Sequence, residues 1–233
     1  MSFGWIAGAG ILYAIFVRPW QMTWGTTREE ATEPLPGDEL VSNPKNQATH
    51  AITIAAPPAD VWPWLVQLGQ DRAGFYSYTF LENLLGCQMR NTYRIVPTWQ
   101  HLAVGDGILF HPKRPRIPVV VVDPERSLVI GGLLDPKTGN PMNSRDVDPD
   151  NYLATSWAFV LRPTTDGKTR LIVRLRGRWP DGLGDWLIQH LFWEPAHFVM
   201  EWKMLRTINR LAESESGVGQ TRTLPEQPRA TTI

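Results

Sequence analysis

The sequence predicts an α+β fold in which one antiparallel sheet is covered by a long C-terminal helix. Two observations lead to this prediction. From residue 105 onward, segments with alternating apolar residues follow one another across short turns, as in a sheet built from hairpins. Such a sheet must bury one face, and the apolar helical stretch 183–212 is the large element available to cover it.

The bulk composition indicates one globular domain with extensions. The chain has 233 residues, 42% of them hydrophobic and 20% charged. Lys plus Arg and Asp plus Glu each number 23, so there is no basic excess and we expect no nucleic-acid partner. The single cysteine, Cys87, excludes an intramolecular disulfide and a cysteine-built zinc site. Eleven tryptophans are typical of proteins with ligand pockets or membrane interfaces.

Residues 1–24 form an apolar N-terminal segment. Its uncharged run, 3–17, would rise about 22 Å as a helix, short of the roughly 30 Å hydrocarbon core. We predict a membrane anchor that makes the protein membrane-associated; the alternative is a hydrophobic helix lying on the domain. Arg18 follows the run and no basic residue precedes it, which favours a cytoplasmic position for the domain.

The composition then divides the rest of the chain. Residues 25–47 are polar and contain three prolines, which predicts an extended linker. The globular domain is expected over 48–213. Residues 214–233 have almost no aliphatic side chains and are predicted to be a disordered tail.

Each element of the domain has its own signal. Alternation in "ATHAITIAAP" predicts a first strand, Pro58 suits the first turn of a helix that ends near Gly69, and 79–85 supplies a second short helix. Two hairpins follow, one turning at 123–126 and one at "TTDGK", with a polar insert at 134–151 between them. The long terminal helix is expected to bend at Pro195.

The last predicted strand carries a ladder of arginines. Leu171, Val173 and Leu175 share one face, and four arginines occupy the other: Arg170, Arg174, Arg176 and Arg178. The simplest interpretation is a solvated outer face. The alternative is a surface for a partner or for anionic lipid.

Several segments together resemble the SRPBCC superfamily, which includes START-related lipid carriers and polyketide cyclase-like proteins. They are "ITIAAPPADVWPWLVQLGQ", "GFYSYTFLENLLG", "VGDGI", "TSWAFVLRP", "TRLIVRLRG" and "HFVMEWKML". "RPW", "WG" and "LPGDEL" bring the chain nearer to a bacterial branch with an N-terminal apolar segment. The resemblance covers about residues 18–213. It implies a helix-grip fold, a curved sheet around the terminal helix with a hydrophobic cavity between them, and it implies no single activity.

The stretch "GFYSYTFLENLLGC" places polar groups in an apolar segment. In a helix grip it would close one end of the cavity, so Tyr76, Tyr78 and Glu82 are predicted to orient a ligand. The alternative is that the tyrosines cap the short helix and Glu82 pairs with a base elsewhere. The predicted binding residues also include Trp62, Phe80, Trp157, Phe159, Phe198 and Glu201, and Leu65, Val173 and Leu205 are further predicted walls.

The terminal helix carries His190, Glu194, His197 and Glu201 at spacings of four, three and four. Glu194 to His197 matches the Glu-x-x-His unit of di-iron bundles. A second unit is missing, and Pro195 is expected to prevent the four side chains from sharing one straight face. We therefore predict no metal and no cofactor. Of His197 and Glu201, one is expected to meet the cavity and the other the surface.

The sequence supports two hypotheses for function. The first is a non-enzymatic protein that binds or carries an apolar small molecule or lipid, held at a membrane by residues 1–24. The second is a cyclase, dehydratase or hydrolase that acts on such a ligand by acid–base catalysis. Nucleophile and phosphate-loop motifs are absent from the sequence, so catalysis by a nucleophile has little support.

Overall fold

The computed structural model describes residues 12–143, 145, 148 and 152–222. Its centre is a six-stranded antiparallel sheet in the order β1-β6-β5-β4-β3-β2. The strands are β1 (Asn46–Ile54), β2 (Gly107–Ile108), β3 (Ile117–Asp123), β4 (Ser127–Leu134), β5 (Leu153–Pro163) and β6 (Thr169–Arg178). Because the first strand pairs with the last, segments far apart in sequence lie side by side along β1 and β6.

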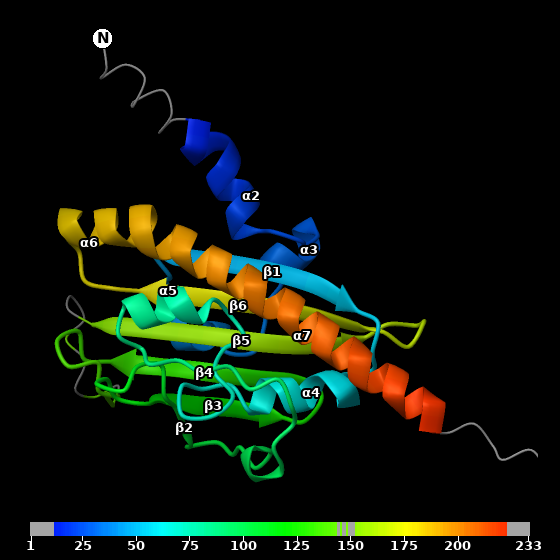
Figure 1. Ribbon diagram of the computed structural model, residues 1–233. Coiled ribbons are helices and arrows are strands. Elements are labelled where there is room, and N and C mark those ends of the chain that lie inside the picture. Colours follow the sequence, from blue (N-terminus) through cyan, green and yellow to red (C-terminus); the bar gives the residue numbers. More distant parts are fainter. Residues whose placement is uncertain (1–11, 144, 146–147, 149–151, 223–233) are drawn as a thin grey trace, which may run out of the picture.

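A long helical segment crosses one face of this sheet (Figure 1). It consists of α6 (Leu183–Ile188), a π-helical turn η5 (Gln189–Trp193) and α7 (Glu194–Arg222). The helix is not interrupted at Pro195. The π-helical turn ends with a bond from Glu194 N–H to Gln189 O, which lets the helix continue past a residue that lacks a donor.

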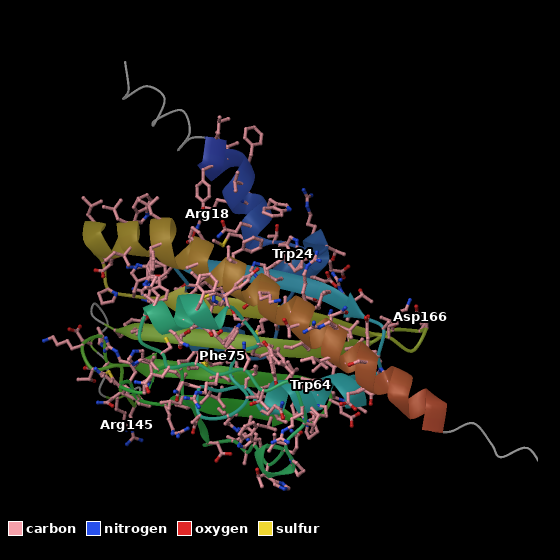
Figure 2. All side chains as sticks on the ribbon, in the orientation of Figure 1. Arg18, Trp24, Trp64, Phe75, Arg145 and Asp166 are labelled. Atoms are coloured by element: carbon pink, nitrogen blue, oxygen red, sulfur yellow. The ribbon has the colours of Figure 1, made fainter. Side chains whose placement is uncertain are left out.

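Two short helices, α4 (Pro58–Val66) and α5 (Thr79–Leu84), follow β1, and a 3-10 turn, η3 (Pro97–Trp99), precedes β2. The core lies between these helices, α7 and the sheet. Its fully buried side chains include Trp64 and Tyr76 from the helical side and Phe159, Leu171 and Val173 from the sheet. Trp64 and Phe75 are visible in this layer in Figure 2. The architecture is the helix grip that the sequence predicted.

The N-terminal part contains η1 (Tyr13–Val17), α2 (Arg18–Met22), α3 (Arg28–Thr32) and η2 (Asp38–Val41). Residues 26–43 are not an extended linker. Thr27 and Glu30 form a reciprocal capping box at the start of α3, and the segment then lies on the outer face of the sheet. Gly37 approaches so closely that a Cβ there would lie 2.5 Å from Val129, and its φ is +89°.

This segment also corrects the interpretation of the arginine ladder as a solvated face. Arg174 is 1% exposed and bonds to Thr49, to the Asp38 carboxylate and to two backbone carbonyls of the segment. Arg170 pairs with Glu30, and Arg176 pairs with Asp38. The acidic residues of 28–38 are therefore the counter-charges of the ladder. The predicted division between linker and domain does not correspond to a division in packing.

The two ends of the chain were predicted to be a membrane anchor and a disordered tail. The described part of residues 1–24 packs on the domain: Met22 is buried, and Trp20 contacts Phe198 on α7 with ring centroids 5.3 Å apart. In the described parts of the chain, no helix combines the length and the apolarity required to cross a bilayer. The predicted disordered tail begins as helix, because α7 runs to Arg222; residues 1–11 and 223–233 lie outside the described residues.

Candidate functional site

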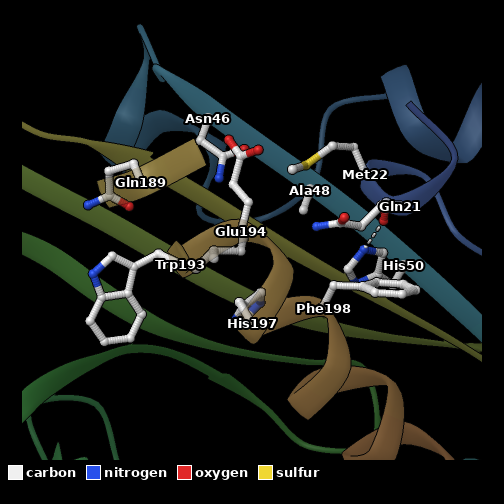
Figure 3. A pocket seen from close by; sticks show the side chains of 11 residues that line it. Gln21, Met22, Asn46, Ala48, His50, Gln189, Trp193, Glu194, His197 and Phe198 are labelled. Atoms are coloured by element: carbon white, nitrogen blue, oxygen red, sulfur yellow. Dashed lines mark hydrogen bonds between the residues drawn. The ribbon is translucent and has the colours of Figure 1, made fainter. Parts of the chain in front are cut away.

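A pocket of about 160 Å³ lies where α2, β1 and the start of α7 meet. Strand alternation directs Asn46, Ala48 and His50 to the same face of β1. The other lining residues are Gln21 and Met22 from α2, Leu175 from β6, and Gln189, Trp193, Glu194, His197 and Phe198 from the terminal helical segment (Figure 3). Five of the eleven lining residues are apolar and six are polar or titratable, although apolar atoms form most of the pocket surface.

Two buried glutamates of α7 organise the charge around this pocket. Each pairs with a histidine four residues earlier: His190 Nδ1 lies 2.5 Å from Glu194 Oε1, and His197 Nε2 lies 2.9 Å from Glu201 Oε2. The pairs are seven residues apart, close to two helical turns, so both lie toward the pocket side of the helix. The π-helical turn and Pro195 do not separate them, contrary to the prediction.

A second basic side chain, from a distant part of the chain, contacts each glutamate. Arg18 binds Glu194 with two parallel bonds, Nε to Oε2 at 2.8 Å and Nη2 to Oε1 at 3.0 Å. His50 of β1 binds Glu201, with Nδ1 2.5 Å from Oε1. Figure 2 shows Arg18 between the N-terminal helix and the terminal helical segment. The N-terminal helix is therefore fixed to α7 at the pocket by a bidentate ion pair.

The contacts of His50 determine which of its ring nitrogens donates and how Glu201 shifts its pKa. Its Nε2 lies 2.8 Å from the backbone oxygen of Gln21, which can only accept, so Nε2 donates. Its Nδ1 faces a carboxylate that also accepts from Trp157 Nε1 at 2.8 Å. Burial by itself lowers the pKa of His50, but the charge and hydrogen bond of Glu201 outweigh it and raise that pKa above 6.5.

Glu201 responds in the opposite direction. Burial by itself raises the pKa of this carboxyl, but the charges of His197 and His50 and their contacts reverse the effect and lower the pKa below 4.5. The site therefore holds a carboxylate between two imidazoles. His197, the more accessible of the two, lines the pocket, so this charge network reaches the pocket wall.

Three polar atoms at the pocket lack a hydrogen-bonding partner in the described structure: Gln21 Nε2, Asn46 Oδ1 and His197 Nε2. The last lies within ion-pair distance of Glu201 but not in the geometry of a hydrogen bond. The Gln21 side chain is buried, and an unpaired polar atom of this kind costs about 1–3 kcal/mol. A ligand with a donor and an acceptor would supply the missing partners.

The predicted orienting group lies elsewhere. Tyr76 is fully buried in the core, where its hydroxyl accepts from Gln67 Nε2 at 2.7 Å. Tyr78 lies at the start of α5 beneath Lys203, whose Nζ is 5.8 Å from the ring centroid. Glu82 is buried, and neither of its carboxylate oxygens has a partner among the described residues, so burial raises its pKa to about 7. None of the three lines this pocket, and their role in binding stays a prediction.

The remaining predicted residues are divided between core, surface and pocket. Leu65, Phe159, Val173 and Leu205 are packed in the core, and Trp62 packs against it. Phe80 is 68% exposed and contacts Tyr78, so it is a surface residue and not a wall of the pocket. Trp157 and Glu201 support the site through their mutual hydrogen bond, and Phe198 lines the pocket itself.

Several contributors to the site were not predicted from the sequence, among them His50, Gln21, Arg18 and Asn46. The repeated His-x-x-x-Glu spacing was a visible signal for the acidic half of the site. Its basic half was not, because 151 positions separate His50 from Glu201 and 176 separate Arg18 from Glu194. In the described residues there is also no group of three or more His, Cys, Asp or Glu side chains suited to hold a metal ion.

Several solved structures are similar to part of this chain at low sequence identity. No family model and no curated protein matches the chain. Among solved structures, protein MLL2253 from Mesorhizobium loti is 20% identical, covering 77% of this chain and 100% of its own at a TM-score of 0.36. Protein NE0264 from Nitrosomonas europaea is 17% identical, with coverages of 78% and 99% and a TM-score of 0.40. A norcoclaurine synthase from Thalictrum is 14% identical, with coverages of 73% and 95% and a TM-score of 0.38.

Proposed function

We propose that this protein, as a member of the SRPBCC superfamily, binds a small and mainly apolar molecule that carries one hydrogen-bonding group. One observation supports the proposal most directly: the pocket between α2, β1 and α7 has a mostly apolar surface, and the Gln21 amide nitrogen in its wall has no hydrogen-bonding partner among the described residues. Apolar walls supply affinity without direction, and a small number of polar groups then fixes orientation. Its volume of about 160 Å³ suits a single ring or one end of a longer chain.

Native mass spectrometry of the full-length protein is the first test, because it shows which molecules co-purify. The second test uses benzene and phenol, which differ by one hydroxyl. Phenol should bind about tenfold more tightly, since its hydroxyl can pair with Gln21 Nε2. NMR titration that follows the indole N–H signals of the tryptophans, including Trp193 at the pocket, measures both affinities.

Matched variants assign this preference to the pocket. Gln21→Met keeps the length of the side chain and should remove the preference for phenol. Gln47→Met is the control, because Gln47 points to the other face of β1 and donates to Ala31 O. Ala48→Leu should fill the pocket and weaken both ligands. Equal binding of phenol and benzene to the unmodified protein would contradict the proposal.

One observation favours a second candidate, an enzyme that uses acid–base catalysis. Glu201 joins His197 at the pocket wall to the buried imidazole of His50. A histidine held by a carboxylate can take and return a proton on a bound ligand, as cyclisation, dehydration or hydrolysis requires. His197→Gln should then abolish conversion of the co-purified ligand while leaving its binding within about twofold. A ligand recovered after incubation with unchanged mass and unchanged NMR spectrum contradicts the enzyme candidate, cyclisation included, and supports the carrier.

We also propose that residues 1–24 hold the protein at a membrane. The supporting observations are the uncharged sequence of residues 1–11 and the exposure of Leu12, Ile15, Phe16 and Val17 in the helix that follows. Deleting residues 1–11 leaves Arg18 and its partner Glu194 in place. That deletion should move the protein from the membrane fraction to the supernatant. Full-length protein already in the supernatant without detergent would refute the anchor.

A further inference from the structure

An exposed apolar surface lies beside the N-terminal helix. We call it the α6–η5 face, and it covers residues 183–193. Within these eleven positions the structure exposes seven leucine, isoleucine, phenylalanine and tryptophan side chains. They are Leu183, Trp186, Leu187, Ile188, Leu191, Phe192 and Trp193.

This composition is unusual for a surface helix. A helix that contacts a domain on one side normally presents polar residues on the other, whereas a helix that is apolar all round is buried or lies in a membrane. Asp185 and His190 are the titratable residues of the α6–η5 face, and it contains no lysine or arginine. Single exposed apolar residues are common, but contiguous apolar patches mark interaction sites.

The N-terminal helix extends this surface. Its exposed large apolar side chains are Leu12, Ile15, Phe16, Val17 and Trp20. The Arg18–Glu194 ion pair and the packing of Trp20 on Phe198 fix α2 against the first turns of α7, immediately after η5. Figure 1 shows α6 and the N-terminal helix on the same side of the molecule, away from β2 and β3.

The pocket adjoins this surface. Trp193 is 46% exposed and belongs to the α6–η5 face, yet it also lines the pocket together with Gln189. The pocket therefore meets the outside of the protein next to the α6–η5 face.

We propose that the α6–η5 face docks on a lipid bilayer beside the N-terminal segment, so that the pocket at Trp193 faces the membrane. The occupant is a bilayer because the chain that leads into this surface, residues 1–11, is itself uncharged and largely apolar. Tryptophans such as Trp186 and Trp193 favour the depth of the headgroups. The inference rests on the proposed function, since it identifies the source from which an apolar ligand would reach the pocket.

Flotation of the full-length protein with vesicles tests the docking surface. Vesicles of phosphatidylcholine alone should bind it, and added salt should not release it, because the surface has no cluster of basic residues that would need anionic lipid. Ile188→Glu and Leu191→Glu should each lower the vesicle partition coefficient about tenfold or more. Ile188 and Leu191 are 53% and 65% exposed, so neither substitution disturbs the core. Val104→Glu is the control, at an equally exposed position on a distant loop before β2.

The outcomes separate the two proposals. If Ile188→Glu and Leu191→Glu bind vesicles as well as the control, the α6–η5 face is not a docking surface. If the unmodified protein is a dimer that ignores vesicles, and the two variants are monomers, the face joins two copies of the chain and the inference is wrong. Phenol binding in solution should be the same in both variants. If the unmodified protein does not bind phenol, the proposed function is refuted. Vesicle binding is measured separately and tests only the docking surface.

Discussion

Two replacements of Glu201 should separate the charge of the site from its hydrogen bonds. The carboxylate accepts from His50 Nδ1 at 2.5 Å and from Trp157 Nε1 at 2.8 Å. In Glu201→Leu both donors lose their acceptor in a buried site, and His197 loses the carboxylate that it contacts. Removing one partner of a buried ion pair costs about 3–5 kcal/mol, and we expect the free energy of unfolding to fall by about that amount.

Glu201→Gln should cost far less. The new amide oxygen can accept from Trp157, and the new amide N–H can donate to Nδ1 of a neutral His50. The Nε2–H of His50 still donates to the backbone oxygen of Gln21, so the hydrogen bonds survive and the charges disappear. We expect a loss of about 1 kcal/mol at neutral pH.

The pH dependence gives the sharper test. Glu201 raises the pKa of His50 above its usual 6.5, so the native state keeps a proton that the unfolded chain releases. The free energy of unfolding should therefore fall as the pH rises above about 6.5 and through the folded pKa of His50. In Glu201→Gln burial lowers the pKa of His50 and only the hydrogen bond to the Gln21 backbone oxygen still raises it, so this fall should vanish or reverse. Glu82, whose pKa burial raises to about 7, contributes to the fall below that pH in both proteins, so their difference isolates His50.

Urea unfolding followed by circular dichroism from about pH 5 to 9 measures both effects. If Glu201→Gln retains the full pH dependence of the unmodified protein above pH 7, the His50–Glu201 pair is not its source. A loss below about 1 kcal/mol in Glu201→Leu would show that the two donors find other partners.

Three further predictions concern the parts of the chain that support the site. Glu82→Gln should raise the free energy of unfolding by about 1–2 kcal/mol at pH 8 and leave it unchanged at pH 4. The reason is that a buried carboxyl with a pKa of about 7 carries an unpaired charge only above that pH, and thermal melts at both pH values check this. Arg174→Leu should cost about 3–5 kcal/mol in urea unfolding, whereas Arg162→Leu, at a half-exposed pair with Glu33, should cost less than about 1 kcal/mol; equal losses would contradict the buried role of Arg174. Deleting residues 1–24 should cost about 3 kcal/mol or more, since Glu194 loses Arg18, and an unaltered unfolding midpoint would refute the contact.

Much of the fold could be predicted because its signals are local. The period-two segments of β5 and β6 flank a turn, and the apolar stretch that became α6, η5 and α7 is long enough to cover a sheet. Residues 26–43 were misjudged because prolines and polar residues were taken to indicate an extended chain. Their Thr27-x-x-Glu30 capping box, and the match between their acidic residues and the arginine ladder, were the signals of a folded segment.

The candidate site was less accessible from sequence. Polar residues between apolar ones predicted a ligand contact at Tyr76 and Glu82. The hydroxyl of Tyr76 instead accepts a hydrogen bond from Gln67 inside the core. The pocket arises where the pairing of β1 with β6 brings His50 under α7, and where Arg18 fixes α2 over them. Such positions follow from tertiary packing, which the spacing of residues along one helix does not encode.

The pocket wall made by Gln21 and Met22 also decides where the protein can be labelled. A fluorophore, affinity tag or surface linkage joined at the N-terminus would be connected through the helix that encloses the pocket and adjoins the α6–η5 face. The far end of α7 lies on the opposite side of the molecule from the N-terminal helix (Figure 1). Handles placed after Arg222 leave the pocket and its surroundings unaltered, so binding measurements on immobilised protein should use that end of the chain.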